Sequence, residues 1–238
     1  MKKRSDLMWD NHILHMYNFD FDNIRMYFDK LISAVDQENF QVTSSAVHLK
    51  NNGVPDEEIA DILDDDDYNA KVFENNTYNI AIIFLYSECE KTLKYQYRVI
   101  GDKKTKKMFK WDNILLLFKE KGIDIKTNSH YAKLNEIREI NNCIKHNGYP
   151  SDVLCNMDNS RWQRSEQIAI QKNELISYYD EARAFFDELV NEIDSVNKKA
   201  LLAEEITEVI NLCNANLSSV DSDKQELIRK AIAKFADL

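Results

Sequence analysis

The stretch TYNIAIIFLYSECEKTLKYQYRVI, residues 77–100, decides the fold of this chain. Its segment IAIIFLY is apolar on every side, and Cys89, Leu93 and Tyr97 continue the apolar pattern at steps of four residues. A helix that is hydrophobic all round belongs in the middle of a bundle. The stretch therefore predicts a central helix with other helices packed around it.

The composition supports an all-α fold. Only four glycines and two prolines occur in 238 residues, which is too few to punctuate a many-stranded sheet. A chain of this length can bury one sizeable core and carry helical extensions beside it. We predict an up-down helical bundle with N-terminal and C-terminal helical extensions.

Two helices are predicted on the N-terminal side of the central stretch. Residues 19–35 carry apolar residues at three- and four-residue spacing, which is typical of an amphipathic helix with one buried stripe. A second, short helix is expected to begin at Pro55, because the three acidic residues after it complement the positive end of a helix dipole. The run Asp64–Asp67 is expected to break that helix.

Several helices are predicted on the C-terminal side. Apolar spacing and glycine stop signals predict helices over 111–121 and over about 131–146. Residues 167–197 contain a heptad seam that should pack lengthwise on neighbouring helices, formed by Leu175, Tyr179, Ala182, Phe186, Leu189 and Ile193. Two shorter helices are expected at 201–212 and after Ser222.

These patterns divide the chain into three parts. The aspartate run separates an N-terminal helical region, 1–65, from a helical bundle over 66–197. The end of the heptad seam separates the bundle from a C-terminal helical extension, 198–238.

Charge and cysteine usage limit the function classes. The formal net charge of −10 argues against a general nucleic-acid coat, because phosphate binding draws its affinity from Lys and Arg. Any contact with RNA must therefore be local, and the lysine-rich segment 98–110 is one place for it. The four cysteines lie far apart without a CxxC pair, which indicates neither a disulfide framework nor a cysteine zinc site.

No metal, cofactor or membrane segment is predicted. His12 and His15 share a helical face, but no third ligand stands at fitting spacing. The basic start of the chain is interrupted by polar residues where a signal peptide would be apolar, and no run reaches membrane-spanning length. We expect a cytoplasmic protein.

The segment EIREINNCIKHNGY, residues 136–149, holds the candidate chemistry. At about 100° per residue, Arg138, Asn142 and His146 fall on one side of a helix, roughly opposite its apolar face. His146 stands in the last turn, where the helix dipole favours a cation by about 0.3 to 1 kcal/mol. That position is also explained by a solvated helix end without any function.

The order of elements resembles the HEPN superfamily over residues 68–197. The resemblance lies in an apolar helix with Glu90 and Leu93, a lysine-rich loop, a helix ending in R-x3-N-x3-H-N-G and a long heptad helix. Many members of that family are metal-independent endoribonucleases of toxin-antitoxin and phage-defence systems, and others only bind RNA, nucleotides or proteins. The resemblance implies a bundle that dimerises with its two motif helices facing each other.

Carried onto this chain, the family's motif matches His146 and Asn142, while Asn141 occupies the usual arginine position. Arg138 lies one turn earlier and is the substitute for that arginine. The resemblance thus implies His146, Arg138 and Asn142 as catalytic residues, and it leaves Lys145, Asn141, Lys104 and Lys107 as RNA-binding residues.

The chemistry explains these residue types. Attack of a ribose 2′-oxygen on the neighbouring phosphate needs an imidazole to move the proton and a guanidinium to stabilise the phosphorane. Along one helix His146 and Arg138 are about 12 Å apart, so a shared phosphate requires Arg138 from a second subunit.

The sequence leaves three functions open. The first is a dimeric endoribonuclease of a defence system, weakened by the loss of the usual arginine and partnered by RNA and by an antitoxin or other defence protein. The alternative is a non-catalytic HEPN-like module that binds RNA or protein. The third is a purely structural bundle. Asn141 is expected to be a partly buried amide, Asn142 to orient His146, and Glu90 to stay solvated or to pair with Arg138.

Overall fold

The computed structural model describes residues 4–100, 110–216 and 225–226, with the side chains of 4–20, 213 and 214 left out. The described part contains helices and no strand, which confirms the all-α class. The elements are α1 (Arg4–Asn51), α2 (Asp56–Ile100), α3 (Trp111–Lys119), a short 3₁₀ helix η1 (Ile125–Thr127), α4 (Tyr131–His146), α5 (Asp152–Met157) and α6 (Lys172–Asn216).

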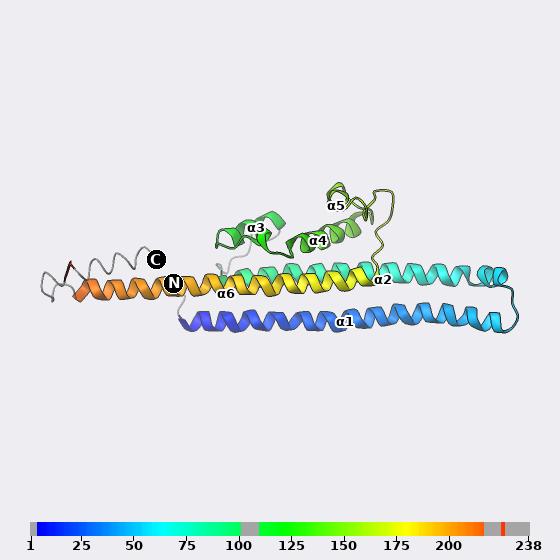
Figure 1. Cartoon of the computed structure of the whole chain (residues 1–238), viewed down its shortest axis with the longest axis horizontal. Helices are drawn as coiled ribbons and strands as arrows, with labels where there is room; N and C mark the ends of the chain where they lie inside the picture. Colours follow the sequence, from blue (N-terminus) through cyan, green and yellow to red (C-terminus); the bar gives the residue numbers. More distant parts are fainter. Residues whose placement is uncertain (1–3, 101–109, 217–224, 227–238) are drawn as a thin grey trace.

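Three long helices set the length of the molecule (Figure 1). The helices α1 and α2 form an antiparallel hairpin, and α6 packs against both of them. The short helices α3, α4 and α5 form a second layer, in which α4 contacts α2 and α6. The tip of the hairpin extends beyond the start of α6, and the last turns of α6 extend beyond the opposite end of the hairpin.

The hairpin turn follows from the sequence Asn52–Gly53–Val54–Pro55. Gly53 has φ +82°, a conformation that costs glycine little. Its N–H donates to the carbonyl of Lys50, and the N–H of Val54 donates to the carbonyl of Leu49, so the last carbonyls of α1 are satisfied. Helix α2 begins directly after Pro55, as the acidic first turn predicts.

The helix break expected at Asp64–Asp67 is wrong, because α2 runs through these residues without interruption. Leu63 and Ala70 are buried on either side of the run, in a helix that packs against α1, and this burial outweighs the low helix propensity of aspartate. Lys71 also pairs with Asp67 one turn away. Neither predicted boundary, 65/66 or 197/198, falls at the end of a helix.

The central position of residues 77–100 is confirmed with one exception. Seven side chains of this segment are fully inaccessible, namely Tyr78, Ala81, Ile82, Leu85, Cys89, Leu93 and Gln96. Ile80, however, is 56% exposed, and Phe84 is only partly buried. The helix is therefore covered on most of its circumference and bare on one side.

The predicted seam of α6 is confirmed, since all six of its side chains are at most 2% exposed. The stripe of α1 is confirmed as well, with Ile24, Phe28 and Val35 buried. Both helices are longer than expected: α1 begins at Arg4 and ends at Asn51, and α6 continues through 201–212 to Asn216 without a break. Of the last predicted helix, after Ser222, the structure describes only residues 225–226, which are helical.

The length and hydropathy of the helices show whether any of them could span a membrane. Within the part of the chain that the structure describes, no helix is both long and apolar enough to cross a bilayer.

Candidate functional site

Helix α4 spans Tyr131–His146, the range that the sequence predicts. Its predicted apolar face lies in the core, with Leu134, Ile137 and Ile140 fully buried. The helix ends where Gly148 adopts φ +75° and its N–H donates to the carbonyl of Cys143. The carbonyl of Gly148 in turn accepts from the N–H of Ile168, which fixes the end of α4 against the segment leading into α6.

The side chain of Arg138 is fixed by neighbouring side chains of the same protomer. Its guanidinium forms an ion pair with the buried Glu139, and its Nε donates to Oδ1 of Asn135 over 3.0 Å. The same guanidinium lies over the ring of Trp111, 5.4 Å from the ring centroid, and only 20% of the side chain is exposed. The positive charge of Arg138 is therefore largely neutralised inside the protomer, and α3 covers it.

Lys145 and His146 differ from Arg138, because both are exposed in the last turn of α4. Asn147 and Tyr149, which follow them, are exposed too. These four side chains give the end of α4 a polar surface with a lysine, an imidazole and an aromatic ring. Of the three predicted catalytic residues, only His146 lies fully on the surface.

The two asparagines of the motif behave differently from the prediction. Asn141 is 1% exposed, so it is buried more deeply than expected, and its Nδ2 donates weakly to Oδ1 of Asn142 over 3.4 Å. Oδ1 of Asn142 thus faces Asn141, and the structure gives Asn142 no hydrogen bond to His146. At this depth Asn141 cannot contact RNA without a rearrangement of α4.

Among the other predicted contacts, the structure describes only that of Glu90. Glu90 pairs with Lys94 one turn away, at 2.5 Å, rather than with Arg138. Lys104 and Lys107 lie outside the described residues, as do the side chains of His12 and His15. Arg138 and His146 stand eight positions apart on α4, about 12 Å along its axis, so one protomer does not place both on one phosphate.

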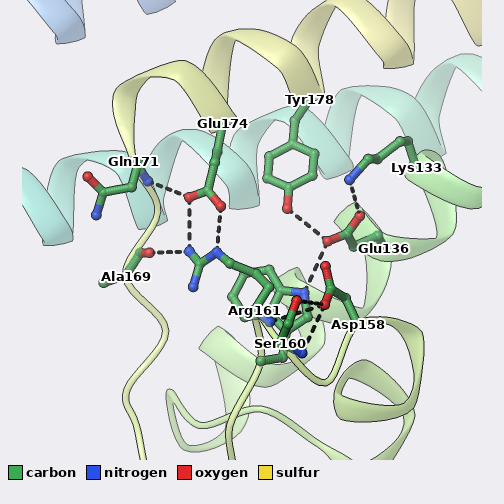
Figure 2. A network of polar contacts seen from close by, with 10 residues as sticks. Lys133, Glu136, Asp158, Ser160, Arg161, Ala169, Gln171, Glu174 and Tyr178 are labelled. Atoms are coloured by element: carbon green, nitrogen blue, oxygen red, sulfur yellow. Dashed lines mark hydrogen bonds and ion pairs between the residues drawn. The ribbon is translucent and has the colours of Figure 1, made fainter.

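A polar network that the motif did not predict lies beside α4 (Figure 2). Its centre is the carboxylate of Glu136, which is 8% exposed. One oxygen accepts from Nε1 of Trp162 over 3.1 Å and from the hydroxyl of Tyr178 over 3.0 Å. The other accepts from Lys133 over 2.6 Å. Burial and the Glu136 charge together raise the pKa of Tyr178 well above its usual value.

The second half of the network joins Arg161 to Glu174. Arg161 donates from Nε and Nη2 to the two carboxylate oxygens and from Nη2 to the carbonyl of Ala169. The N–H of Gln171 donates to Glu174 as well. Burial alone would raise the pKa of Glu174, but the Arg161 and Gln171 hydrogen bonds outweigh it and lower that pKa.

The network is structural in character. It borders an open cleft of about 300 Å³, but its carboxylates are matched by donors from the chain itself. The contacts fasten the segment between α5 and α6 onto α4 and α6. A single tryptophan in the polar segment 156–167 is the sequence signal for it, because a buried indole N–H needs an acceptor.

Among the described residues, no group of three or more His, Cys, Asp or Glu side chains could hold a metal ion. The end of α4 is the candidate site, with Lys145 and His146 as its accessible groups.

Comparison with known proteins gives no further guide to this site. No protein-family description, no curated protein and no solved structure matches the chain.

Proposed function

We propose that the protein is a HEPN-like helical protein that binds RNA through the C-terminal end of α4, without efficient cleavage. The observation that carries the proposal is the contrast between two cationic groups on one helix. Lys145 is exposed in the last turn, whereas Arg138 is paired with Glu139 and covered by Trp111. Binding needs an accessible cation, and catalysis needs a guanidinium that is free to meet the phosphorane.

The surroundings of α4 favour an anionic ligand. Lys145 and His146 are exposed at the end of α4, and Tyr149, three residues after His146, is also exposed, so a base can stack on its ring. The arrangement is local, in keeping with a net charge of −10. The HEPN resemblance implies a place in a toxin-antitoxin or phage-defence system, with an antitoxin or another defence protein as partner.

The test is the affinity for a fluorescein-labelled single-stranded RNA, measured by anisotropy at low salt. We expect the double variant Lys145→Ala, His146→Ala to bind at least about tenfold more weakly, and its salt dependence to fall by about 0.7 for each lost phosphate contact. Lys199→Ala, an exposed lysine on α6, is the matched control. Equal binding by the double variant and the control would remove the proposal.

Arg138 is unsuitable as the test position. Its removal leaves the buried carboxylate of Glu139 without its partner, which destabilises a protein by about 3 kcal/mol or more. A loss of binding in such a variant would not separate a structural effect from a lost RNA contact.

The second candidate is a dimeric metal-independent endoribonuclease, and the exposed imidazole of His146 favours it. It predicts RNA cleavage in the presence of EDTA, with cyclic phosphate ends, and loss of that cleavage in His146→Ala. RNA that stays intact at high protein concentration while still bound would leave the binding function alone.

A further inference from the structure

One face of the α1–α2 hairpin exposes apolar side chains to solvent. On α2, Ile62, Phe73 and Ile80 are 50%, 42% and 56% exposed. Phe84 continues this line and meets Tyr27 of α1, with 5.0 Å between the ring centroids, and Tyr27 is itself 40% exposed. Ile62 and Phe84 are about 33 Å apart along α2 at a rise of about 1.5 Å per residue, and the exposed Asp66 and Asn69 lie between Ile62 and Phe73 on the same side.

The other helices of the protomer pack on sides of α1 and α2 that face away from this apolar line. Helix α6 is joined to α1 by an ion pair of Lys172 with Asp36, and Asp36 lies about 180° around α1 from Tyr27. On α2, Tyr86 faces the layer of α3 and α4, with its ring 6.5 Å from that of Trp111. Tyr86 lies about 140° around α2 from Phe73. Neither layer covers the apolar line.

Charged residues lie along the same side of α2, and their signs are opposite in its N-terminal and C-terminal parts. Toward the N-terminus of α2 stand the exposed Glu58 and Asp66, and toward its C-terminus stand Lys91, Lys94 and Arg98. All of them, with the four apolar residues of α2, fall within an arc of about 80° on the helix. We call this set of nine residues the α2 stripe: Glu58, Ile62, Asp66, Phe73, Ile80, Phe84, Lys91, Lys94 and Arg98.

The α2 stripe is complementary to a second copy of itself that is rotated by 180° about an axis perpendicular to the helix. Taking the point between residues 78 and 79 as the middle, Asp66 and Lys91 lie about 19 Å on either side of it. Phe73 and Phe84 lie about 8 Å on either side. A two-fold axis through that point therefore places acid opposite base and aromatic opposite aromatic.

We propose that the α2 stripe is the interface for a second copy of this chain, packed antiparallel about a two-fold axis near Ile80. An isologous interface uses the same patch on both subunits, so each charge pair forms twice. A different partner would need its own matching order of acidic, apolar and basic residues, whereas a second copy supplies that order automatically. Lys91 and Lys94 pair on their own helix with Glu88 and Glu90, at i,i+3 and i,i+4 spacing, and ion pairs of this kind contribute little to stability.

The test is sedimentation equilibrium of the full chain, with far-UV circular dichroism to check folding. The wild type is expected to be a dimer, and Ile80→Glu is expected to raise its dissociation constant at least about tenfold by burying two carboxylates at the axis. Tyr68→Glu is the matched control, because Tyr68 is 67% exposed and lies about 140° around α2 from Phe73. It should leave the dimer intact.

A charge reversal makes the test independent of folding effects, because both positions are exposed. Asp66→Lys alone and Lys91→Asp alone should each weaken the dimer, and the two together should restore it. A wild type that stays monomeric at its highest soluble concentration would overturn the proposal. A dimer that none of these substitutions weakens would overturn it too, because it would place the interface on another surface.

Discussion

Glu136 shows how a single side chain organises its surroundings. Its carboxylate lies on α4, yet its two buried donors come from residues 26 and 42 positions later in the chain. Each buried donor left without an acceptor costs about 1 to 3 kcal/mol. By accepting these two hydrogen bonds, the carboxylate of Glu136 stabilises the buried positions of Trp162 and Tyr178. The position of the segment before α6 depends on this one residue.

The raised tyrosine pKa values predict a loss of stability at alkaline pH. Burial, aided by nearby acidic charge, raises the pKa of Tyr178 and raises that of Tyr78 to about 12. Above pH 10 the unfolded chain releases these protons while the folded chain keeps them, so the free energy of unfolding falls as pH rises. Each group contributes up to about 1.4 kcal/mol per pH unit until its folded pKa is reached.

Urea unfolding at pH 8, 10 and 11 measures this fall. Tyr178→Phe is the control, because it removes one of the groups without removing the ring, and its stability should decline less steeply than that of the wild type. Parallel declines in the two proteins would show that Tyr178 does not titrate with a raised pKa.

At the scale of an element, the sequence predicts what periodicity and stop residues determine. The bounds of α4 were predictable because apolar spacing and Gly148 both mark its end. The network around Glu136 was not, because its partners are distant in sequence and only the fold brings them together. The exposure of Ile80 was missed for a related reason: an apolar segment does not reveal which of its sides the other helices leave bare.

At the aspartate run Asp64–Asp67, the local sequence preference predicts the wrong conformation. Four aspartates in succession have low helix propensity, which predicts a break, but their side chains are exposed, and Leu63 and Ala70 on either side of them are buried. Tertiary packing therefore decides the conformation here, and local preference does not.

Substitution of Asp65 tests this continuity. Asp65→Pro should destabilise the protein by about 3 kcal/mol, because proline removes a helical hydrogen bond and clashes with the preceding turn. Asp65→Ala should be neutral or slightly stabilising, since alanine favours helix and removes one like charge. Thermal unfolding compares the two variants. A proline variant as stable as the alanine variant would mean that the run is a loop or hinge in solution.

At the scale of the molecule, the two surfaces described here lie on different sides of α2. The α2 stripe faces away from the protomer, whereas α4 lies on the side marked by Tyr86 and Trp111. A dimer formed through the α2 stripe consequently keeps its two α4 helices apart. It does not bring Arg138 of one subunit to His146 of the other, and this arrangement favours binding over cleavage.

The separation of the two surfaces yields a last prediction about RNA affinity. Ile80→Glu, which should be monomeric, is expected to bind the labelled RNA with the wild-type affinity per protomer, within about twofold, because the proposed RNA-binding surface uses Lys145 and His146 of a single chain. Anisotropy titrations of both proteins at equal protomer concentration measure this. Loss of RNA binding on conversion to the monomer would mean that the ligand spans two subunits. In that case the dimer would have to pair its α4 helices, and the shared cleft of an endoribonuclease would become the better account of the same residues.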